Sequence, residues 1–337
     1  RRNAGVLMTH PDDIGCADEL ATEIIWGDQG PPPPTRVRPF VLTDQERYVI
    51  REYVGKLKEQ GIIEEGFADC VSNVFIISKK QYRPGLDLMQ CFRPVVDLRP
   101  INHYQAIPTM ANSSYAKQLL SIGQEHPKYF MVLDISSGFH NIPIKLERDR
   151  RKLGIISPIA GESLRFARLP MGAKCSPYLF MKQLNSIMTS ALKELNYLYM
   201  DDLLIKHLHF AIWLACIEVT LMVLRRHHFR INAVKLFICP KEGVVYLGHL
   251  MTKTGIRPVR SKVEALQKLQ LPTTRRLLRR AVGMYAYYRV FLPRFSQLTK
   301  RLYARMRGDG KEKITLSPEE EADFMKLKHS LIHITEL

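Results

Sequence analysis

Three aspartates interrupt apolar segments at places where an uncompensated charge would be costly. Asp134 lies near the end of the run YFMVLDI at 129–135, and Asp201 and Asp202 divide the run YLYMDDLLI at 197–205. Burial of an ionised carboxylate is strongly unfavourable unless a partner compensates its charge. A divalent cation supplies that compensation most directly, and magnesium prefers one or two carboxylates together with phosphate oxygens. The three acids therefore indicate a metal site and phosphoryl-transfer chemistry.

The three acids need not play equal parts in such a site. Two metal ions about 3.5–4 Å apart can stabilise both the attacking and the leaving oxygen of an in-line transfer. Adjacent strand residues point to opposite faces, so Asp201 and Asp202 are both primary ligands only if the turn twists between them. We expect Asp134 and Asp201 to bridge the metals and Asp202 to play a secondary part. The alternative is that Asp201 and Asp202 form only a hydrophilic hairpin turn.

The elements that position these acids follow from the apolar runs and their breaks. The two runs that carry the acids predict a buried strand and a β-hairpin with its turn at Asp201–Asp202. Thr43 followed by Glu46 predicts a capping box at the start of a helix that ends near Gly61. The other expected elements are strands at 71–77 and 92–98, a strand pair at 244–251, helices at 178–195 and 209–228, a turn at Pro84–Gly85, and helical structure after Ser261 that breaks at Pro272 and Pro293.

Charge is distributed unevenly along the chain. The 337 residues carry a net charge of +17, and 46% of them are apolar, which excludes a chain disordered throughout. From Lys253 to Arg307 the net charge is +14, with Glu264 as the single acid. Such a block predicts a polyanionic partner, either nucleic acid or an anionic membrane. The most apolar run, 210–224, is shorter than the roughly 20 residues that span a bilayer, so we expect no membrane partner.

The cysteines give no sign of a metal or redox motif. None of the six lies within a CxxC spacing, so neither a zinc site nor a redox pair is indicated. No signal peptide is recognisable at the N-terminus, and we therefore expect an intracellular protein with reduced thiols.

Six motifs, in order over about 40–305, resemble those of reverse transcriptases of gypsy-type (Metaviridae) LTR-retrotransposon Pol polyproteins. The retroviral enzymes share this layout. The motifs are FRPVVDLRPIN at 92–102, similar to the fingers motif; VLDISSGFHNIPI at 132–144, similar to the first-aspartate motif; LPMGAKCSP at 169–177, similar to the template-grip loop; YMDD at 199–202, similar to the metal-binding turn; VYLGHLMTKTGIRPVRSKV at 245–263, similar to the primer-grip hairpin and its extension; and GMYAYYRVFLPRF at 283–295, similar to the pattern G-L-x-N-Y-Y-R-x-F-I-P-x-F.

The resemblance implies an α+β right-hand polymerase with fingers, a palm of antiparallel sheet packed on helices, and a helical thumb. It implies RNA- and DNA-templated DNA synthesis from a primer 3′-hydroxyl, with dNTPs and two Mg²⁺ ions, for which Mn²⁺ could substitute. The implied segments are an N-terminal linker or tail at 1–38, fingers at 39–112 and 142–176, palm with primer grip at 113–141 and 177–251, a basic thumb at 252–307, and the start of a connection to a missing RNase H domain at 308–337.

The resemblance also assigns residues that would bind the nucleotide. Lys79 and Arg93 would reach its triphosphate, with Lys80 as the rival of Lys79 because strand register decides which lysine points inward. Phe139 would leave no room for a ribose 2′-hydroxyl. The plain alternatives are solvated charges on a hairpin for the two basic residues and a core side chain for Phe139. The remaining implied residues are Met171, for which a core position is the alternative, Gly172 and Lys235, with Ile135 joining the aspartates as a metal ligand.

A second group of residues would contact the primer–template. The expected primer grip is Tyr246, Leu247 and Gly248. Four arginines share one side of a predicted helix, and the absence of a local acid favours phosphate binding over a merely solvated face. They are Arg275, Arg276, Arg279 and Arg280, opposite an apolar side made by Leu278, Val282 and Tyr285. The resemblance adds Asp97, Arg99, Tyr199 and Met200.

The expected partners are an RNA template, an RNA/DNA or DNA/DNA duplex, and dNTPs. By resemblance, protease, RNase H and integrase would be polyprotein neighbours, and a cytoplasmic virus-like particle the location. One alternative is a catalytically inert nucleic-acid-binding relative from a decayed or domesticated element. Another is an RNA-dependent RNA polymerase, against which Phe139 and the LPMG loop argue. The stretch between Lys80 and Arg93 is longer than the usual turn of the family.

Overall fold

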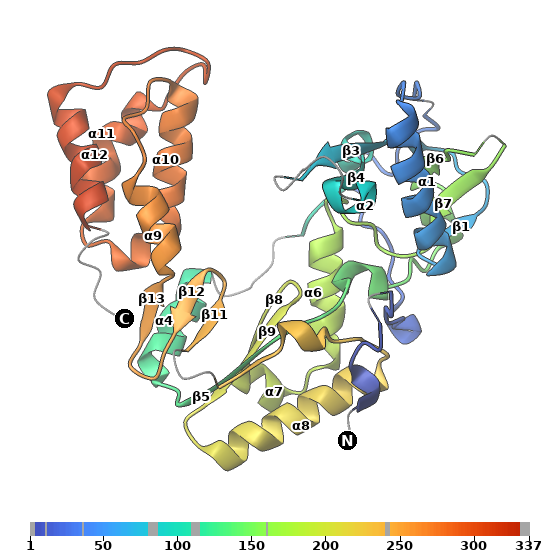
Figure 1. The fold of residues 1–337 in the computed structure, drawn as a ribbon, viewed down its shortest axis with the longest axis horizontal. Helices are drawn as coiled ribbons and strands as arrows, with labels where there is room; N and C mark the ends of the chain where they lie inside the picture. Colours follow the sequence, from blue (N-terminus) through green and yellow to red (C-terminus); the bar gives the residue numbers. More distant parts are fainter. Residues whose placement is uncertain are drawn as a thin grey trace. The chain divides into compact units, whose positions relative to one another are not determined.

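The computed structural model describes residues 4–10, 12–35, 37–79, 87–108, 115–159, 161–239 and 243–330 (Figure 1). The chain divides into two compact units. The first comprises Arg1–Ala111, Leu133–Leu203 and Leu214–Leu236, and the second comprises Asn112–Val132, Leu204–Trp213 and Phe237–Leu337. Helices alternate with short, mostly antiparallel sheets, which agrees with the predicted α+β class.

The N-terminal segment packs within the first unit, although we expected a linker or tail at 1–38. It contains two short 3-10 helices, η1 (Ala4–Val6) and η2 (Asp18–Leu20). Several of its apolar side chains are buried, among them Ala17 and Ile24. Single backbone bridges join it to distant segments of the chain instead of a regular strand pairing. Irregular contacts of this kind require no periodic pattern of apolar residues, which is why the sequence of the segment indicated a linker.

Helix α1 (Asp44–Glu59) begins at the predicted capping box. The Thr43 side chain accepts a hydrogen bond from the Glu46 N–H, and the Glu46 carboxylate accepts one from the Thr43 N–H at 2.8 Å. Two orphan donors of the first turn are thereby satisfied. The chain turns back at Gly61, whose φ of +64° lies in the left-handed region.

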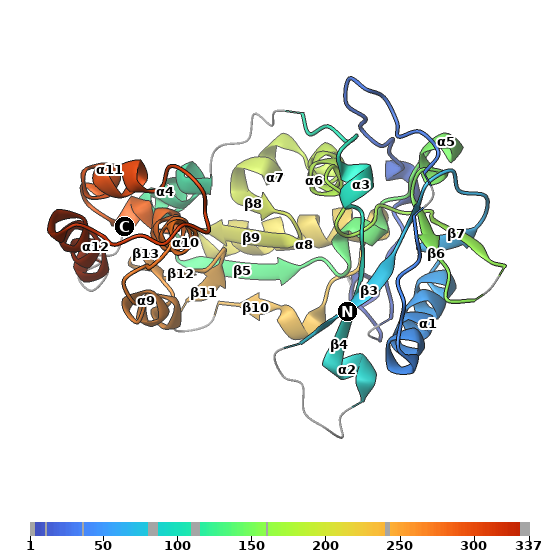
Figure 2. The ribbon, with the colours of Figure 1, turned by 90° about the horizontal axis from the view of Figure 1, so that it is seen from above.

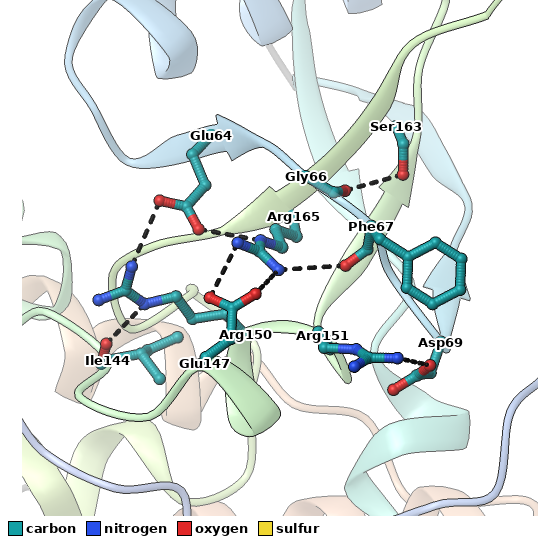
Figure 3. Close-up of polar contacts among 10 residues, drawn as sticks. All are labelled: Glu64, Gly66, Phe67, Asp69, Ile144, Glu147, Arg150, Arg151, Ser163 and Arg165. Atoms are coloured by element: carbon teal, nitrogen blue, oxygen red, sulfur yellow. Dashed lines mark hydrogen bonds and ion pairs between the residues drawn. The ribbon is translucent and has the colours of Figure 1, made fainter.

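A four-stranded sheet follows α1, with the order β1-β7-β6-β2. Its strands are β1 (Ile63–Glu65), β2 (Val71–Ser72), β6 (Gly154–Ile156) and β7 (Ser163–Phe166). Arg165 of β7 lies between two carboxylates (Figure 3). Its Nε donates to Glu64 at 2.9 Å, and its Nη2 donates to Glu147 of α5 (Glu147–Arg150) at 2.9 Å. The guanidinium thereby ties the sheet to α5.

The predicted hairpin that carries Arg93 is confirmed. Strand β3 (Val74–Ser78) pairs antiparallel with β4 (Phe92–Val96), and Ile77 lies opposite Arg93. The expected strand at 71–77 is broken at Asn73, because its two halves join different sheets: β2 pairs with β6, and β3 pairs with β4. Two short helices flank β4, namely α2 (Leu88–Cys91) and α3 (Arg99–Asn102). The expected turn at Pro84–Gly85 and the rival residue Lys80 lie outside the described residues.

A second four-stranded sheet carries the three aspartates. Its order is β10-β5-β9-β8, and its strands lie side by side in Figure 2. They are β5 (Tyr129–Asp134), β8 (Asn196–Tyr199), β9 (Asp202–His207) and β10 (Phe237–Ile238). In β5 and β9 the four central residues are buried and the terminal ones are half-buried. The predicted hairpin with its turn at the acids is confirmed.

The helices of this region differ from the prediction at one point. The single helix expected at 178–195 is two helices, α6 (Ser176–Ile187) and α7 (Ser190–Leu195). Met188 is extended, and the Thr189 side chain caps α7 by accepting from the Leu192 N–H. The predicted long helix is α8 (Phe210–Arg226), and α4 (Tyr115–Glu125) precedes β5. Among the described residues, no helix is long and apolar enough to cross a bilayer.

The C-terminal part of the second unit is a small sheet followed by helices. The sheet contains β11 (Val244–Tyr246), β12 (His249–Met251) and β13 (Ile256–Pro258), all antiparallel. The helices are α9 (Arg260–Gln267), α10 (Arg275–Tyr287), η5 (Arg289–Phe291), α11 (Phe295–Arg305) and α12 (Pro318–Ser330). Tyr285 of α10 contacts Phe324 of α12 edge to face, with ring centroids 6.0 Å apart. The helix breaks at Pro272 and Pro293 are confirmed.

Candidate active site

The first unit brings two of the three acids to one cavity. Asp134 ends β5, Asp201 lies in the β8–β9 turn, and the Ile135 N–H donates to the Asp201 carbonyl at 2.9 Å. The turn needs Met200 at a φ of +57°. A cavity of about 290 Å³ opens here; it is lined by Asp134, Ile135, Ser136, Ser137, Gly138, Phe139, Met171, Asp201, Asn232 and Lys235.

The charges around this cavity do not balance. The Lys235 ammonium lies 3.1 Å and 3.2 Å from the two carboxylate oxygens of Asp134. Burial raises the pKa of Asp202, the nearby carboxylates of Asp201 and Asp134 raise it further, and the Lys235 ammonium opposes them. Among the described residues that act on Asp202, the exposed Lys235 is the one cation, and Asp134 and Asp201 are the acids. The local charge favours an additional cation.

The donor set fits a metal whose coordination the substrate completes. Among the described residues, no three His, Cys, Asp or Glu side chains converge into a ready-made metal cage. Magnesium is commonly held by one or two carboxylates plus substrate phosphates, and dedicated all-protein cages are unusual for it. Asp134 and Asp201 line the cavity and can supply those carboxylates, while Ile135 can supply a carbonyl oxygen. Asp202 is not one of the lining residues.

Phe139 lies on a tight turn at the wall of the cavity. Its ring is half-buried and meets Phe180 of α6 edge to face, with centroids 5.6 Å apart. Gly138 permits this approach, because a Cβ there would lie 3.0 Å from the Phe180 ring. The Asn141 amide closes the turn by donating to the carbonyls of Ser136, Ser137 and Gly138 at 2.8–3.3 Å. The aromatic ring is therefore exposed on one side to the cavity and backed on the other.

The loop after β7 contributes Met171 to the same cavity. Its side chain is 52% exposed, so the alternative of a core methionine is wrong. Gly172 has a φ of +91°, and its carbonyl accepts a hydrogen bond from the Asn102 side chain at 2.9 Å. A glycine suits that left-handed position. Gly172 itself is not one of the cavity-lining residues.

The β3–β4 hairpin and its continuation place the other predicted basic residues outside the cavity lining. The Lys79 ammonium donates to the Met89 carbonyl at 3.2 Å, and the Arg93 side chain is exposed. Arg99 forms a two-pronged ion pair with Asp97, with both N–O distances 2.8 Å, and this pairing lowers the pKa of Asp97. Asp97 and Arg99 therefore engage each other in this structure.

The predicted primer-grip residues form a tight turn in the second unit. Leu247 and Gly248 join β11 to β12 with φ values of +47° and +68°. The Leu247 carbonyl accepts from the Tyr287 hydroxyl at 2.5 Å and lies 2.7 Å from Nδ1 of His249. Tyr246 is fully buried beneath the turn. The turn is therefore fixed to α10.

The four arginines of α10 are not equivalent, which corrects the expectation that they lack a nearby acid. Arg275 pairs with Glu312 at 2.8 Å and also donates to the backbone of Arg305. Arg279 donates to the Met306 carbonyl at 2.7 Å and to the Gly308 carbonyl at 2.5 Å. The acid was missed because it lies 37 residues further along the chain. The exposed Arg276 and Arg280 have no such side-chain bond among those the structure describes. As predicted, Leu278, Val282 and Tyr285 are buried on the other side.

Sequence reasoning missed two residues that support the cavity. Asn232 lines it, and its N–H donates to the Asp134 carbonyl at 3.1 Å. Arg168 donates to three backbone carbonyls from separate segments. Its position immediately before the LPMG loop could have drawn attention, but its partners are remote in sequence.

A family model described as "Reverse transcriptase (RNA-dependent DNA polymerase)" matches residues 77–251, just over half of the chain. The chain belongs to the reverse transcriptase family. The resemblance inferred from the motifs is thus confirmed. Reverse transcriptases generally use divalent metal ions.

Relatives of this reverse transcriptase chain occur in retrotransposons and retroviruses. The chain is 28% identical to the retrovirus-related Pol polyprotein from transposon opus of Drosophila melanogaster, over 84% of its own length and 28% of that protein. It is 29% identical to the Gag-Pol polyprotein of walleye dermal sarcoma virus, over 88% of itself and 16% of the relative. The Pol polyprotein from transposon gypsy is 27% identical over 77% of the chain and 24% of that relative. The chain therefore spans about a quarter or less of these polyproteins.

The fold is shared with a retroviral enzyme. The foamy viral protease-reverse transcriptase in complex with an RNA/DNA hybrid superimposes with a TM-score of 0.78 at 21% identity, covering 100% of this chain and 43% of that one. The structure of that enzyme with double-stranded DNA gives a TM-score of 0.77 at 20% identity and covers 67% of its chain. The right-hand polymerase fold implied by the motifs is confirmed.

Removal of one acid should stabilise the metal-free reverse transcriptase. A carboxyl whose pKa is raised by folding stabilises the folded state less as pH increases, so ionised Asp202 costs stability at pH 7. Asp202→Asn should therefore raise the melting temperature in EDTA at pH 7, and the gain should shrink as the pH falls to 4, where the carboxyl of the unfolded chain is also partly protonated. Thermal unfolding at both pH values measures this.

The matched control is Glu59→Gln, which removes an exposed carboxylate from α1. It should change the melting temperature little at either pH. A melting temperature for Asp202→Asn at pH 7 equal to or below that of the parent would contradict the account of the charge surplus.

Proposed function

We propose that the chain is an RNA-directed DNA polymerase that also copies DNA, extending a primer 3′-hydroxyl with dNTPs. The observation that supports this best is the single cavity lined by Asp134, Asp201, Phe139 and Lys235 in a chain of the reverse transcriptase family. Carboxylates, an aromatic wall and an ammonium group are suited to a metal-bound triphosphate and its sugar. The two strand ends fix the carboxylates before any substrate binds.

Asp134 and Asp201, with the Ile135 carbonyl, would hold Mg²⁺, and Mn²⁺ could substitute. Bound divalent ions supply Lewis-acid stabilisation of the phosphate oxygens during transfer. Asp202, at the start of β9, adds negative potential to the site and takes a secondary part. The strand ends hold the carboxylates close together, and burial together with the neighbouring carboxylates raises the pKa of Asp202.

Basic and loop residues would orient the nucleotide. Lys235 is exposed and pairs with Asp134, so its ammonium can shift to a nucleotide phosphate when another cation compensates the charge on Asp134. Lys79 and Arg93 of the β3–β4 hairpin would contact the triphosphate. Met171 and Gly172 would lie against the base or the template.

The primer–template would be held through its phosphates, largely without sequence readout. The Leu247–Gly248 turn, with Tyr246 beneath it, would position the primer end. Arg276 and Arg280 offer free guanidinium groups to the duplex, whereas Arg275 and Arg279 stabilise α10. The other proposed contacts are Asp97, Arg99, Tyr199 and Met200. The relatives are Pol and Gag-Pol polyproteins, which supports protease, RNase H and integrase neighbours and a virus-like particle as the location.

Primer extension tests the proposed activity. A labelled primer on poly(rA) with dTTP and Mg²⁺ or Mn²⁺ should be extended by the parent protein. Asp201→Asn should lower the rate by at least about 100-fold, because an amide cannot replace the carboxylate as a metal ligand. The control Glu59→Gln should extend normally. Absence of extension by the parent would favour an inert nucleic-acid-binding protein, and full extension by Asp201→Asn would exclude the metal role of that residue.

Sugar selection tests the proposed part of Phe139. Phe139→Val shortens the side chain at the cavity wall and makes room for a 2′-hydroxyl. The preference for dTTP over UTP, measured as the ratio of kcat/KM values, should fall on the order of 100-fold, with most of the change in the KM for UTP. Tyr303→Phe on α11 serves as the aromatic control. An unchanged ratio in Phe139→Val would show that another residue selects the sugar.

Salt dependence tests the unequal roles of the α10 arginines. Arg276→Ala or Arg280→Ala should each lower the slope of log affinity against log salt by about 1, because each removes one phosphate contact. Arg275→Ala should leave the slope nearly unchanged and lower the melting temperature instead, because it loses Glu312 and a backbone carbonyl. Filter binding over a salt series and thermal unfolding distinguish the two. Equal slopes for all three variants and the parent would contradict this division.

A further inference from the structure

The turn that carries Phe139 is held by Asn141, which lies within a family motif, and by groups that lie outside the motifs. The Asn141 amide closes the turn on itself, and the Asn141 carbonyl in turn accepts from the Ala17 N–H at 2.8 Å. Ala17 is fully buried in the N-terminal segment. The wall of the cavity therefore has a support more than 100 residues away in the sequence.

Arg168 joins this turn to two other segments. Its Nη1 donates to the Gly15 carbonyl at 2.8 Å and to the His140 carbonyl at 3.2 Å, and its Nε donates to the Gly61 carbonyl at 3.0 Å. One planar guanidinium thus binds the N-terminal segment, the Phe139 turn and the end of α1. A lysine has the charge but lacks the fork that meets three carbonyls at once.

Gly15 allows the N-terminal segment to lie close to the turn that carries Phe139. A Cβ at Gly15 would lie 2.0 Å from the His228 carbonyl oxygen and 2.3 Å from Oδ1 of Asn141. Both atoms belong to groups that cannot move away easily. The His228 carbonyl is part of the backbone just after α8, and the Asn141 side chain closes the turn. Any larger residue at Gly15 must move the segment away from the turn.

The same segment also reaches the backbone that supports Asp134. The Met8 N–H donates to the Ile231 carbonyl at 3.0 Å, and the Ile231 N–H donates to the Val6 carbonyl at 2.9 Å. The neighbouring Asn232 N–H donates to the Asp134 carbonyl. The N-terminal segment therefore contacts both the metal-ligand side and the Phe139 side of the cavity through short chains of hydrogen bonds.

We propose that Arg168 and Gly15 are positioning residues for sugar selection, which hold the Phe139 turn at the distance that excludes a 2′-hydroxyl. The proposal rests on the proposed role of Phe139. Neither residue contacts the nucleotide; each acts through the backbone of the turn. Loss of this support lets the turn retreat, and the cavity then accepts a ribonucleotide.

Steady-state incorporation of dTTP and UTP by the full chain tests this. Arg168→Lys and Gly15→Ala should each lower the dTTP preference on the order of tenfold, since a displacement of about 1 Å at a site has effects of this size or larger. The change should lie mainly in the KM for UTP, while the kcat for dTTP and the affinity for duplex stay within about twofold of the parent. A role in general stability would instead lower all activities together.

Matched controls are Arg148→Lys, at an exposed position of α5, and Gly27→Ala, where the nearest atom to a new Cβ is 3.4 Å away. Both should keep the parent preference. An unchanged preference in both Arg168→Lys and Gly15→Ala, alongside a lost preference in Phe139→Val, overturns the proposal and leaves the Phe139 role intact. An unchanged preference in Phe139→Val means that the underlying role has failed. Parallel loss of dTTP activity, duplex affinity and melting temperature in both variants also overturns the positioning role.

Discussion

Electrostatic repulsion among three carboxylates is the constraint on which the rest of this structure depends. Asp134, Asp201 and Asp202 lie at the ends of two buried strands, where Asp134 and Asp202 are half-buried and Asp201 is exposed. The fold pays for this arrangement with a pKa for Asp202 that is raised above its ordinary value. Lys235 provides partial compensation through Asp134. The cations that we propose for this cavity would balance the surplus negative charge.

Holding repelling groups together requires rigid support, and the backbone around the cavity supplies it. The Ile135 N–H ties β5 to the turn at Asp201, and the Asn232 N–H holds the Asp134 carbonyl. Phe180 and the Asn141 amide also fix the turn that carries Phe139. Positive charge is concentrated elsewhere, since the basic stretch Lys253–Arg307 lies in the second unit. The metal binding and the duplex binding that we propose would thus draw on oppositely charged parts of the chain.

Local patterns predicted the elements that carry the chemistry. The apolar runs around Asp134 and Asp201 predicted a strand and a hairpin, because a strand that is buried on both faces has a continuous apolar sequence. The acids that interrupt these runs therefore indicated a functional site. The capping box at Thr43 is equally local. Contacts between distant segments were not predictable: Glu312 neutralises Arg275 from 37 residues away, and the N-terminal segment packs through isolated bridges. The break at Met188 was missed because apolar periodicity continues across it.

The most direct test of the account is Mn²⁺ binding measured by isothermal titration calorimetry, with the protein bound to a primer–template whose primer lacks a 3′-hydroxyl. We expect this complex to bind Mn²⁺ weakly without a nucleotide. Binding should become at least about tenfold tighter when the complementary dNTP is added, since substrate phosphates complete the coordination. Asp134→Asn should abolish that increase. Equal Mn²⁺ affinity with and without the dNTP, or an increase that survives in Asp134→Asn, would contradict the central claim.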